Sequence, residues 1–377
     1  MFNKGFSGVT FSVCASMLIL SVLFFGSCKK QAAERLNKKD QMILIYMAAN
    51  NDLRQDAINC LNRMEAGFSG KNDLLVYIKT TSENSCILKV KHDNTERIIS
   101  DTLMRYGNDN SSDPRFMSKI IEDARSLSPA ASYGLVLWSH ASSWAPPLGV
   151  KTKAFGEDRG TDMDLIDLKA ALPKDFLYII FDACSMASIE AIYELRNNSR
   201  YILASPTEVL SSSYPYEQIT ANLFEGEHGL KAIAEKFMNY YRSMNGEYVS
   251  ATVSLIDTKE LELLAGYTRS LLDSKEAKAG FNTQNIQRLD FDSKTRVPAY
   301  DFQHFLAQNF SFDDYAVIAN QLKKVVLFKD HTAGFLGNPI NNFSGLSIYL
   351  PRANDIYQNY YSKLAWYEDG GAYNLFK

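Results

Sequence analysis

The sequence predicts an α/β fold: a mostly parallel sheet with helices on both faces, followed by a C-terminal α/β extension. Short apolar runs rich in β-branched and aromatic residues alternate with segments that carry apolar residues every three or four positions. Strands that alternate with helices form parallel sheets whose two faces are covered. With 46% hydrophobic and 22% charged residues, the 377-residue chain can bury one large core or two smaller ones.

The first 28 residues predict a secretion signal. Lys4 gives a positive start, residues 9–25 are almost wholly apolar, and Gly-Ser-Cys follows at 26–28. Small residues before a Cys resemble a lipobox, at which bacteria attach lipid and cleave, so Cys28 is the predicted lipidation site. Lipid on Cys28 would anchor the protein to a membrane of the bacterial cell envelope, on its periplasmic or surface face. The alternatives are an uncleaved anchor helix and an ordinary cleaved signal.

A polar tether over 29–40 leads into a core predicted for residues 41–245. Helices with apolar residues at three-to-four spacing are expected at 112–127, 163–172, 187–195 and 217–224. Strands are expected at 42–48, 74–79, 135–138, 177–181 and 201–204.

Residues 246–377 predict the C-terminal extension or subdomain. A strand is expected at 250–256, helices at 258–273 and 300–308, and a further apolar run at 346–350. A polar link around 290–294 separates the two helices. These units either continue the main sheet or form a subdomain beside it.

Charge and histidine content argue against two kinds of function. The chain has 40 Lys and Arg against 43 Asp and Glu, a net charge of -3, so nothing favours nucleic acid as a partner. His92, His228, His304 and His331 are dispersed without metal-ligand spacing. No zinc site is predicted.

The cysteine count points to one thiol with a special role. After Cys14 and Cys28 are assigned to the signal and its lipid, Cys60, Cys86 and Cys184 remain, which is an odd number. Cys60 falls in a helical pattern and Cys86 opens a strand-like run at 86–90, so packing roles are favoured for both. A disulfide between them is the alternative in an oxidising compartment.

Two reactive side chains follow predicted strands. The run at 134–138 leads into His140, and the run at 176–181 leads into Cys184. Ligands of parallel sheets bind beyond the carboxyl ends of the strands, so an imidazole and a thiol from neighbouring strands would face one cleft. An imidazole that takes the thiol proton frees a thiolate to attack a carbonyl, and the helix start near Ala187 would favour that thiolate. Simple packing and hydrogen-bonding roles are the alternative.

The residues around this pair resemble a known family. Segment 139–144 (Ser-His-Ala-Ser-Ser-Trp) resembles the histidine motif of clostripain-family cysteine peptidases, and segment 181–190, with Asp-Ala-Cys at 182–184, resembles their nucleophile motif. Segments 299–303, 345–351 and 361–365 are similar to late family segments, so the resemblance spans roughly 41–377. It implies a caspase-like fold, a peptidase core at 41–245, and peptide hydrolysis after Arg or Lys by Cys184 and His140.

The resemblance also implies an oxyanion site and shows one departure from the family there. The backbone N–H groups of Ala141 and Cys184 are the expected oxyanion donors. The family has Gly where this chain has Ala141; the N–H survives, but a methyl group borders the place where a carbonyl must enter. Slower or more selective catalysis is the consequence.

Asp182 is the candidate floor of a pocket for a basic side chain. It lies two residues before Cys184, on the same side of the strand and about 6–7 Å away. A carboxylate so close would disfavour the thiolate, so it is a poor partner for the nucleophile. The resemblance supports the pocket role instead, while a carboxylate that accepts loop N–H groups is the structural alternative.

The family's second pocket acid is missing at its usual place. Glu208 is the candidate replacement, with Ser212 also assigned to substrate binding. Tyr214 and Tyr216 would either wall the pocket or, as is more usual for aromatic residues after a strand, belong to the core.

The segment 149–158 between the two catalytic strands corresponds to the place where family members cut themselves after a basic residue. Lys153, followed by Ala154, is the predicted cleavage site, which would leave two associated fragments of a monomer. The alternatives are cleavage of this loop by an unrelated protease, since exposed loops are where proteases nick a chain, and no cleavage at all. No cofactor is required, although Glu157, Asp158, Asp162 and Asp164 offer oxygens for calcium, which family relatives bind.

The predicted function is therefore that of a cysteine endopeptidase acting on protein or peptide substrates. A catalytically weak or inactive binding lipoprotein is the first alternative, motivated by Ala141 and the missing second acid. A transpeptidase that uses the same two residues is the second.

Overall fold

Strand β1 (Lys39–Asn50) runs through the centre of the fold. Residues 41–49 are buried. Met42 and Leu44 pack into one hydrophobic core, whereas Ile43 and Ile45 pack into a second core on the opposite face. Coverage of both faces explains why the apolar run in this strand is uninterrupted.

The structure, a computed structural model, describes residues 1, 39–70, 72–145, 155–274, 281–291, 297–352 and 354–376. The predicted signal with Cys14 and Cys28, the tether up to residue 38, and the predicted cleavage site Lys153 lie outside the described residues. Within the described ranges, no helix is both long and apolar enough to cross a bilayer.

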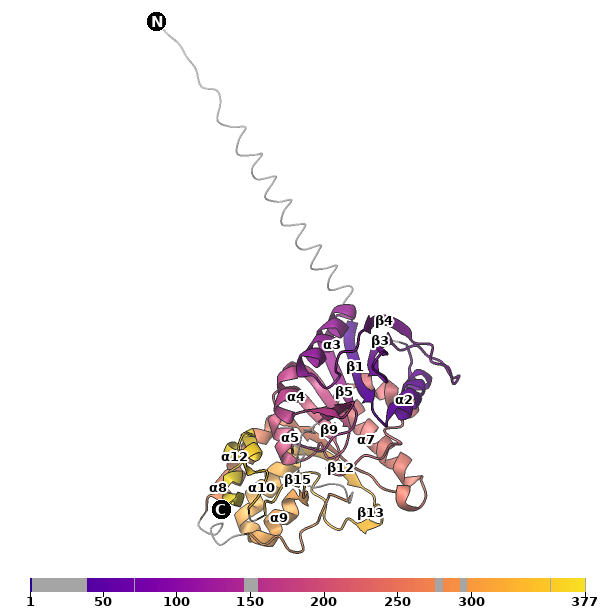
Figure 1. Ribbon diagram of the computed structural model, residues 1–377. Helices are drawn as coiled ribbons and strands as arrows, with labels where there is room; N and C mark the ends of the chain where they lie inside the picture. Colours follow the sequence, from indigo (N-terminus) through magenta and orange to yellow (C-terminus); the bar gives the residue numbers. More distant parts are fainter. Residues whose placement is uncertain are drawn as a thin grey trace.

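The main sheet is parallel in its middle and antiparallel at its edges. The strand order is β12-β10-β9-β8-β5-β1-β2-β3-β4, and the five strands from β9 to β2 are parallel (Figure 1). The short strand β6 adds to the end of β1 in parallel and pairs with β7. The bounds are β2 (Asp73–Lys79), β3 (Ser85–Lys89), β4 (Asp101–Tyr106), β5 (Ala130–Trp138), β6 (Phe155–Asp158), β7 (Thr161–Met163), β8 (Phe176–Asp182), β9 (Ser199–Ala204), β10 (Thr252–Asp257) and β12 (Val326–His331).

Helices cover both faces of this sheet, as predicted. One face is covered by α3 (Pro114–Leu127), α4 (Leu165–Ala171), α5 (Ile189–Glu194), α8 (Leu261–Leu272), α9 (Phe302–Asn309), α10 (Phe312–Val325) and α12 (Ala365–Asp369). The other is covered by α2 (Arg54–Gly67), α6 (Tyr216–Ile219) and α7 (Gly226–Arg242).

Side chains just before the helices explain where several of them begin. The carboxylate of Asp113 accepts hydrogen bonds from two N–H groups of the first turn of α3, and Asp164 and Ser188 do the same for one N–H each in α4 and α5. The helix predicted at 217–224 is instead α6 followed by a 3₁₀ turn (Thr220–Phe224). At that junction the Tyr216 carbonyl accepts from both the N–H and the hydroxyl (2.5 Å) of Thr220, a side-chain bond of the kind that bends helices.

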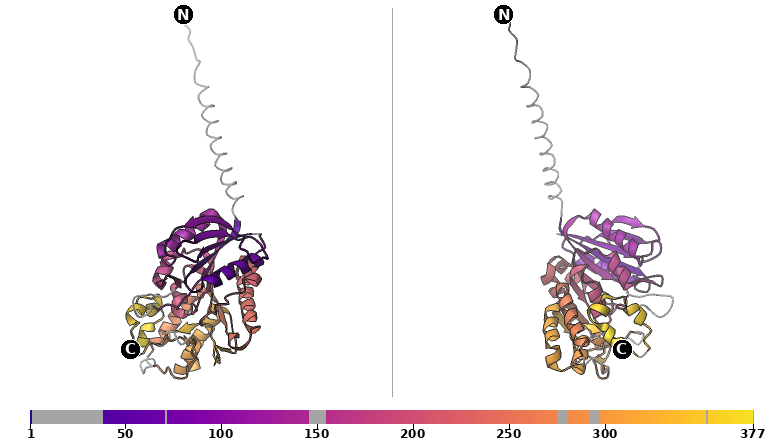
Figure 2. Two further views of the ribbon diagram at one scale, coloured as in Figure 1. Left: turned by 45° about the vertical axis from the view of Figure 1, so that its right-hand side comes forward. Right: turned by 90° about the vertical axis from the view of Figure 1, so that its left-hand side faces the viewer.

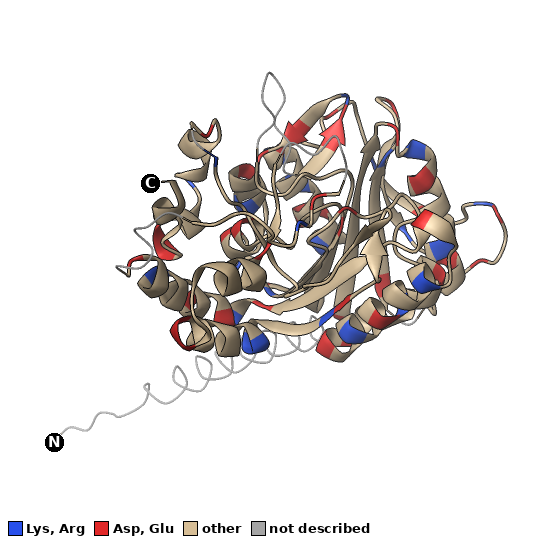
Figure 3. Ribbon diagram, turned by 90° about the horizontal axis from the view of Figure 1, so that it is seen from below, with Lys and Arg blue, Asp and Glu red and all other residues tan. Residues whose placement is uncertain are grey.

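The C-terminal segment extends the main sheet. β10 pairs antiparallel with β9 and with β12. The helices of this segment gather at the end of the sheet away from β3 and β4 (Figure 2). A small sheet joins β11 (Tyr300–Asp301) to β15 (Ser347–Ile348), β13 (Gly334–Phe335) pairs with β14 (Asn338–Pro339), and a short helix, α11 (Gln358–Tyr361), precedes α12. Basic and acidic residues are interspersed over the surface helices (Figure 3).

Candidate active site

Strands β5 and β8 bring His140 and Cys184 to the same end of the sheet, beyond the carboxyl ends of the strands. The two strands are parallel neighbours, and their register sets Trp138 opposite Asp182. His140 and Cys184 each lie two residues beyond these paired positions. The two strands are therefore neighbours, which is the condition on which the sequence predicts that an imidazole and a thiol face one cleft. Both residues leave the sheet where the pockets of parallel sheets form.

Cys184 lies half-buried in the turn between β8 and α5. Its Sγ atom accepts a hydrogen bond from the Val209 N–H (3.3 Å) and lies 3.7 Å from the Val209 carbonyl oxygen. Ser185 has φ of 61°, in the left-handed region, and its N–H donates to the Thr207 carbonyl (2.8 Å). A non-glycine residue in this region costs about 1–3 kcal/mol, which the contacts with the segment after β9 offset.

His140 makes a hydrogen bond that the sequence did not predict. Its Nε2 lies 2.6 Å from Oδ1 of Asp52, a residue between β1 and α2 whose side chain is 81% exposed. A carboxylate only accepts, so Nε2 carries the hydrogen, and in the neutral ring Nδ1 holds the lone pair. The sequence signal that could have indicated this contact was the position of Asp52 just after β1. Strand β1 is the parallel neighbour of β5, so their carboxyl ends lie side by side.

Strand β6 holds the backbone around His140. The Gly156 N–H donates to the His140 carbonyl (3.0 Å), and the Glu157 N–H donates to the Ser139 hydroxyl (3.2 Å). Ala141 lies across from Phe155 in an antiparallel bridge. The hydrogen bond from the Gly156 N–H to the His140 carbonyl belongs to this bridge, and it does not involve the Ala141 N–H.

A direct hydrogen bond links the loops that carry His140 and Cys184. The Ser143 hydroxyl donates to the Ser188 hydroxyl (2.6 Å), and the Ser188 oxygen also accepts from the Ala191 N–H at the start of α5 (3.2 Å). Ser143, like Ser185, has a left-handed backbone, with φ of 65°.

Asp182 is buried and accepts hydrogen bonds from the segment 213–216. Its Oδ2 accepts from the Ser213 hydroxyl, from the Tyr216 hydroxyl (2.9 Å) and from the Tyr214 N–H (3.5 Å). Burial raises the pKa of Asp182, and these hydrogen bonds only partly oppose the shift. Tyr214 and Tyr216 are each 1% exposed and belong to the core, as the favoured interpretation predicts.

The other two predicted pocket residues have partners as well. Glu208 Oε1 accepts from the Phe291 N–H (3.2 Å). The Ser212 carbonyl accepts from Arg63 Nη2 (3.0 Å), which also donates to Cys60 Sγ (3.1 Å). Cys60 and Cys86 are both free thiols, so they do not form a disulfide in this structure.

Late segments of the chain pack against Trp144 and against α5, the helix that follows Cys184. Trp144, four residues after His140, lies in an aromatic cluster with Tyr349 and Tyr361, at ring-centroid distances of 4.9 and 4.7 Å. Glu190 Oε1 accepts from the Tyr349 N–H (2.9 Å) and the Tyr361 hydroxyl (2.8 Å). Burial raises the pKa of Glu190 to about 7, despite these hydrogen bonds.

Two of the acidic residues considered for calcium make separate contacts within the protein. Asp158 pairs with the buried Lys79 (2.6 Å), and Asp164 begins α4 by accepting from the Ile166 N–H (2.7 Å). Across the described ranges, no three His, Cys, Asp or Glu side chains form a cluster able to hold a metal ion.

A mostly parallel sheet with helices on both faces is the caspase-like α/β fold of C11 cysteine proteases, and Cys184 and His140 follow two neighbouring strands of it. The family model described as the clostripain family matches residues 45–375, and the chain belongs to this family. A comparison with curated protein sequences gave no match.

Solved structures of the same kind of protease are similar over nearly the whole chain. The inactive zymogen of a C11 protease from Parabacteroides distasonis has a TM-score of 0.77 and 29% identity, and the match covers 90% of this chain and 99% of that chain. A secreted C11 cysteine protease from Bacteroides thetaiotaomicron, solved with an irreversible peptide inhibitor, has a TM-score of 0.77 and 27% identity, and the match covers 88% and 99%. These similarities support a peptidase that acts on peptide substrates.

Proposed function

We propose that this chain is a cysteine endopeptidase in which Cys184 is the nucleophile and His140 the base. The observation that supports this most is the pairing of β5 with β8, since both residues follow the paired ends by two positions. The hydrogen bond between His140 Nε2 and Asp52 adds support, because it leaves Nδ1 as the ring nitrogen able to take a proton.

The reaction proceeds by acyl transfer. His140 takes the thiol proton, and Cys184 Sγ bonds to the carbonyl carbon of the scissile peptide, whose oxygen becomes an oxyanion held by the N–H groups of Ala141 and Cys184. The C–N bond then breaks as the imidazolium gives its proton to the leaving amine. Water, deprotonated by His140, attacks the thioester, and the acid product leaves with the thiol restored.

The side chain before the cut is Arg or Lys, and Asp182 is its partner. Support comes from the position of this carboxylate at the paired end of β8, where Oδ2 is held by groups from one loop. Glu208 and Ser212 lie on the segment that follows β9 and complete the binding region.

Activation occurs by self-cleavage after Lys153. The inactive zymogen known for the similar protease from Parabacteroides distasonis supports a precursor form. Intact chain should convert to two associated fragments with a new amino terminus at Ala154. Cys184→Ala should stay intact, and Lys153→Ala should be cut elsewhere or not at all; cleavage of Cys184→Ala after Lys153 at the wild-type rate would refute self-processing.

The protein is anchored in the bacterial envelope by lipid on Cys28. Support comes from the apolar run and the small residues before Cys28. Labelling with a radioactive fatty acid should tag the wild type, and equal labelling of Cys28→Ala would refute the idea. The reaction needs no metal; activity that disappears with a chelator and returns with calcium would instead point to the oxygens around Asp162 and Asp164.

A second candidate function is that of a catalytically weak binding protein. Asp182 favours it, because Oδ2 already accepts three hydrogen bonds from the protein itself. A transpeptidase is the third candidate, distinguished by mass spectrometry of products formed with an added amine.

The test is hydrolysis of fluorogenic peptides ending in Arg, Lys or Leu by the chain from Lys30 onward, with Cys184→Ala as control. Release from Arg and Lys peptides that the control lacks is expected. No difference between wild type and control would favour the binding protein.

A further inference from the structure

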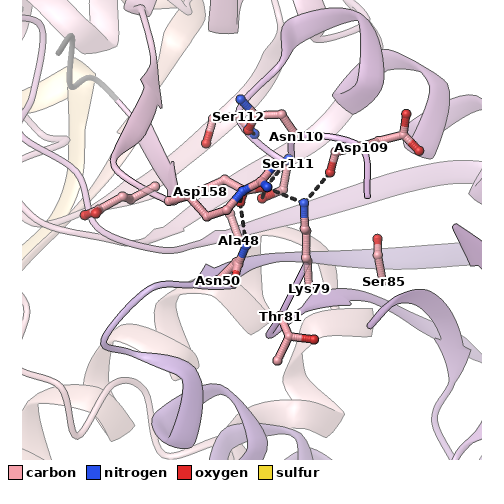
Figure 4. A network of polar contacts seen from close by, with 12 residues as sticks. Ala48, Asn50, Lys79, Thr81, Ser85, Asp109, Asn110, Ser111, Ser112 and Asp158 are labelled. Atoms are coloured by element: carbon pink, nitrogen blue, oxygen red, sulfur yellow. Dashed lines mark hydrogen bonds and ion pairs between the residues drawn. The ribbon is translucent and has the colours of Figure 1, made fainter. Parts of the chain in front are cut away.

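Two opposite charges are buried together beside the candidate active site. Lys79 is the last residue of β2 and Asp158 the last residue of β6, and both side chains are 0% exposed. The distance from Nζ to Oδ2 is 2.6 Å. Figure 4 shows the two side chains pointing toward each other from these separate strands.

Polar groups from two further segments complete this pair (Figure 4). Lys79 also donates to the Asp109 carbonyl. Asp158 Oδ2 accepts from the N–H (2.7 Å) and the hydroxyl (3.0 Å) of Ser111, and Oδ1 accepts from Asn50 Nδ2 (2.7 Å). Burial raises the pKa of Asp158, but the bonds from Lys79, Ser111 and Asn50 outweigh it, and the pKa lies below its ordinary value.

The strand that Asp158 ends is the strand that holds the backbone at His140. In β6, Glu157 and Asp158 pair with Ala49 and Asn50 of β1. The Gly156 N–H, two residues before Asp158, donates to the His140 carbonyl (3.0 Å). The ion pair and the histidine loop are therefore joined by one four-residue strand.

A buried ion pair is a poor device for stability alone. Removing two charges from water costs about as much as their attraction returns, and apolar residues of similar size often do as well. A charge that must meet its partner does select one register, because a slip by one residue turns Asp158 to the other face of β6. Only the observed register also places the Gly156 N–H at His140.

We propose that Lys79 and Asp158 form a positioning pair, which fixes β6 on β1 and thereby holds the His140–Ala141 backbone in place for the reaction. This inference rests on the proposed function for the roles of His140 and Ala141. Neither Lys79 nor Asp158 touches substrate.

The test removes both charges together. Asp158→Asn alone leaves the buried charge of Lys79 without a carboxylate partner, and Lys79→Met alone leaves Asp158 only the half-exposed Arg159, whose Nε lies 3.4 Å from Oδ1. Both single variants should unfold at a lower temperature than wild type, Asp158→Asn the more strongly, whereas the double variant should fold. The control is Arg200→Met with Asp257→Asn, which removes a partly buried ion pair between the start of β9 and the end of β10, far along the sheet from β6.

Two readouts decide the outcome, measured on the mature full chain. In the Lys79→Met/Asp158→Asn variant, kcat should fall by about tenfold or more with little change in KM, because misplacement of a reacting group by about 1 Å costs up to about a hundredfold. The Gly156 and Glu157 amides should exchange with deuterium faster than in the control. A double variant that matches the control in kcat and in amide exchange would overturn the proposal.

Failure of the proposed function gives a different pattern. If wild type shows no Cys184-dependent hydrolysis, the peptidase assignment is wrong. Amide exchange then remains as the test of whether Lys79 and Asp158 hold the His140 backbone. Faster exchange at Gly156 and Glu157 in the double variant then still supports an anchor for the His140 backbone, and unchanged exchange overturns it.

Discussion

Nε2 of His140 lies 2.6 Å from Oδ1 of Asp52, a side chain that is 81% exposed. The exposed carboxylate orients the imidazole from the solvent side. Exposed pairs contribute little energy, so we predict that Asp52→Ala lowers kcat by only about two- to fivefold, with KM unchanged.

Asp52→Asn should lose less, because its amide oxygen still accepts from Nε2. Asp56→Ala, on the first turn of α2, is the control and should behave as wild type. Steady-state kinetics on one Arg peptide measures all three. A loss in Asp52→Ala as complete as that of His140→Ala would contradict a purely orienting role.

Asp182 should set the preference for basic substrates. We predict that Asp182→Asn lowers kcat/KM for Arg and Lys peptides by about a hundredfold, because a desolvated cation loses its partner, while a Leu peptide changes little. Because burial raises the pKa of Asp182, wild type should also lose its preference for Arg over Leu as the pH falls, earlier than an ordinary Asp would allow. An equal loss on all three peptides in Asp182→Asn would assign the residue to structure alone.

Glu190 should make stability depend on pH. Its pKa is raised from 4.5 to about 7 in the folded state, so the stability that its protonated form contributes is complete below about pH 4.5 and is lost as the pH rises through 7. The full change is on the order of 3 kcal/mol.

Glu190→Gln keeps an oxygen for Tyr349 and Tyr361 but does not titrate. We predict that the free energy of unfolding of this variant, relative to wild type, rises between pH 5 and pH 8. Denaturant titrations at several pH values measure it. A constant difference across this range would mean that Glu190 titrates normally.

The central strands could be predicted from the sequence because each is buried on both faces. Five apolar runs correspond to β1, β2, β5, β8 and β9, and the motif residues fall just beyond two of them. Strand β4 at the sheet edge is largely exposed, and β6 has four residues, two of them acidic, so neither carries an apolar signal.

The contacts that complete the site could not be predicted from local patterns. Asp52 meets His140 across 88 residues, and Tyr361 meets Glu190 across 171. Lys79 and Asp158, 79 residues apart, each look like ordinary surface charges in sequence, and only the pairing of β6 with β1 buries them together. Such pairs depend on tertiary register, which neither propensity nor periodicity contains.

The most direct test of the central claim is the hydrolysis of one Lys peptide by Cys184→Ala, His140→Ala and the double variant, with thermal unfolding to establish that each is folded. If the two residues act as one unit, each single variant should lose nearly all activity, and the double variant should lose little more than either single variant. Losses that multiply in the double variant, or substantial hydrolysis by folded Cys184→Ala, would contradict catalysis by this pair.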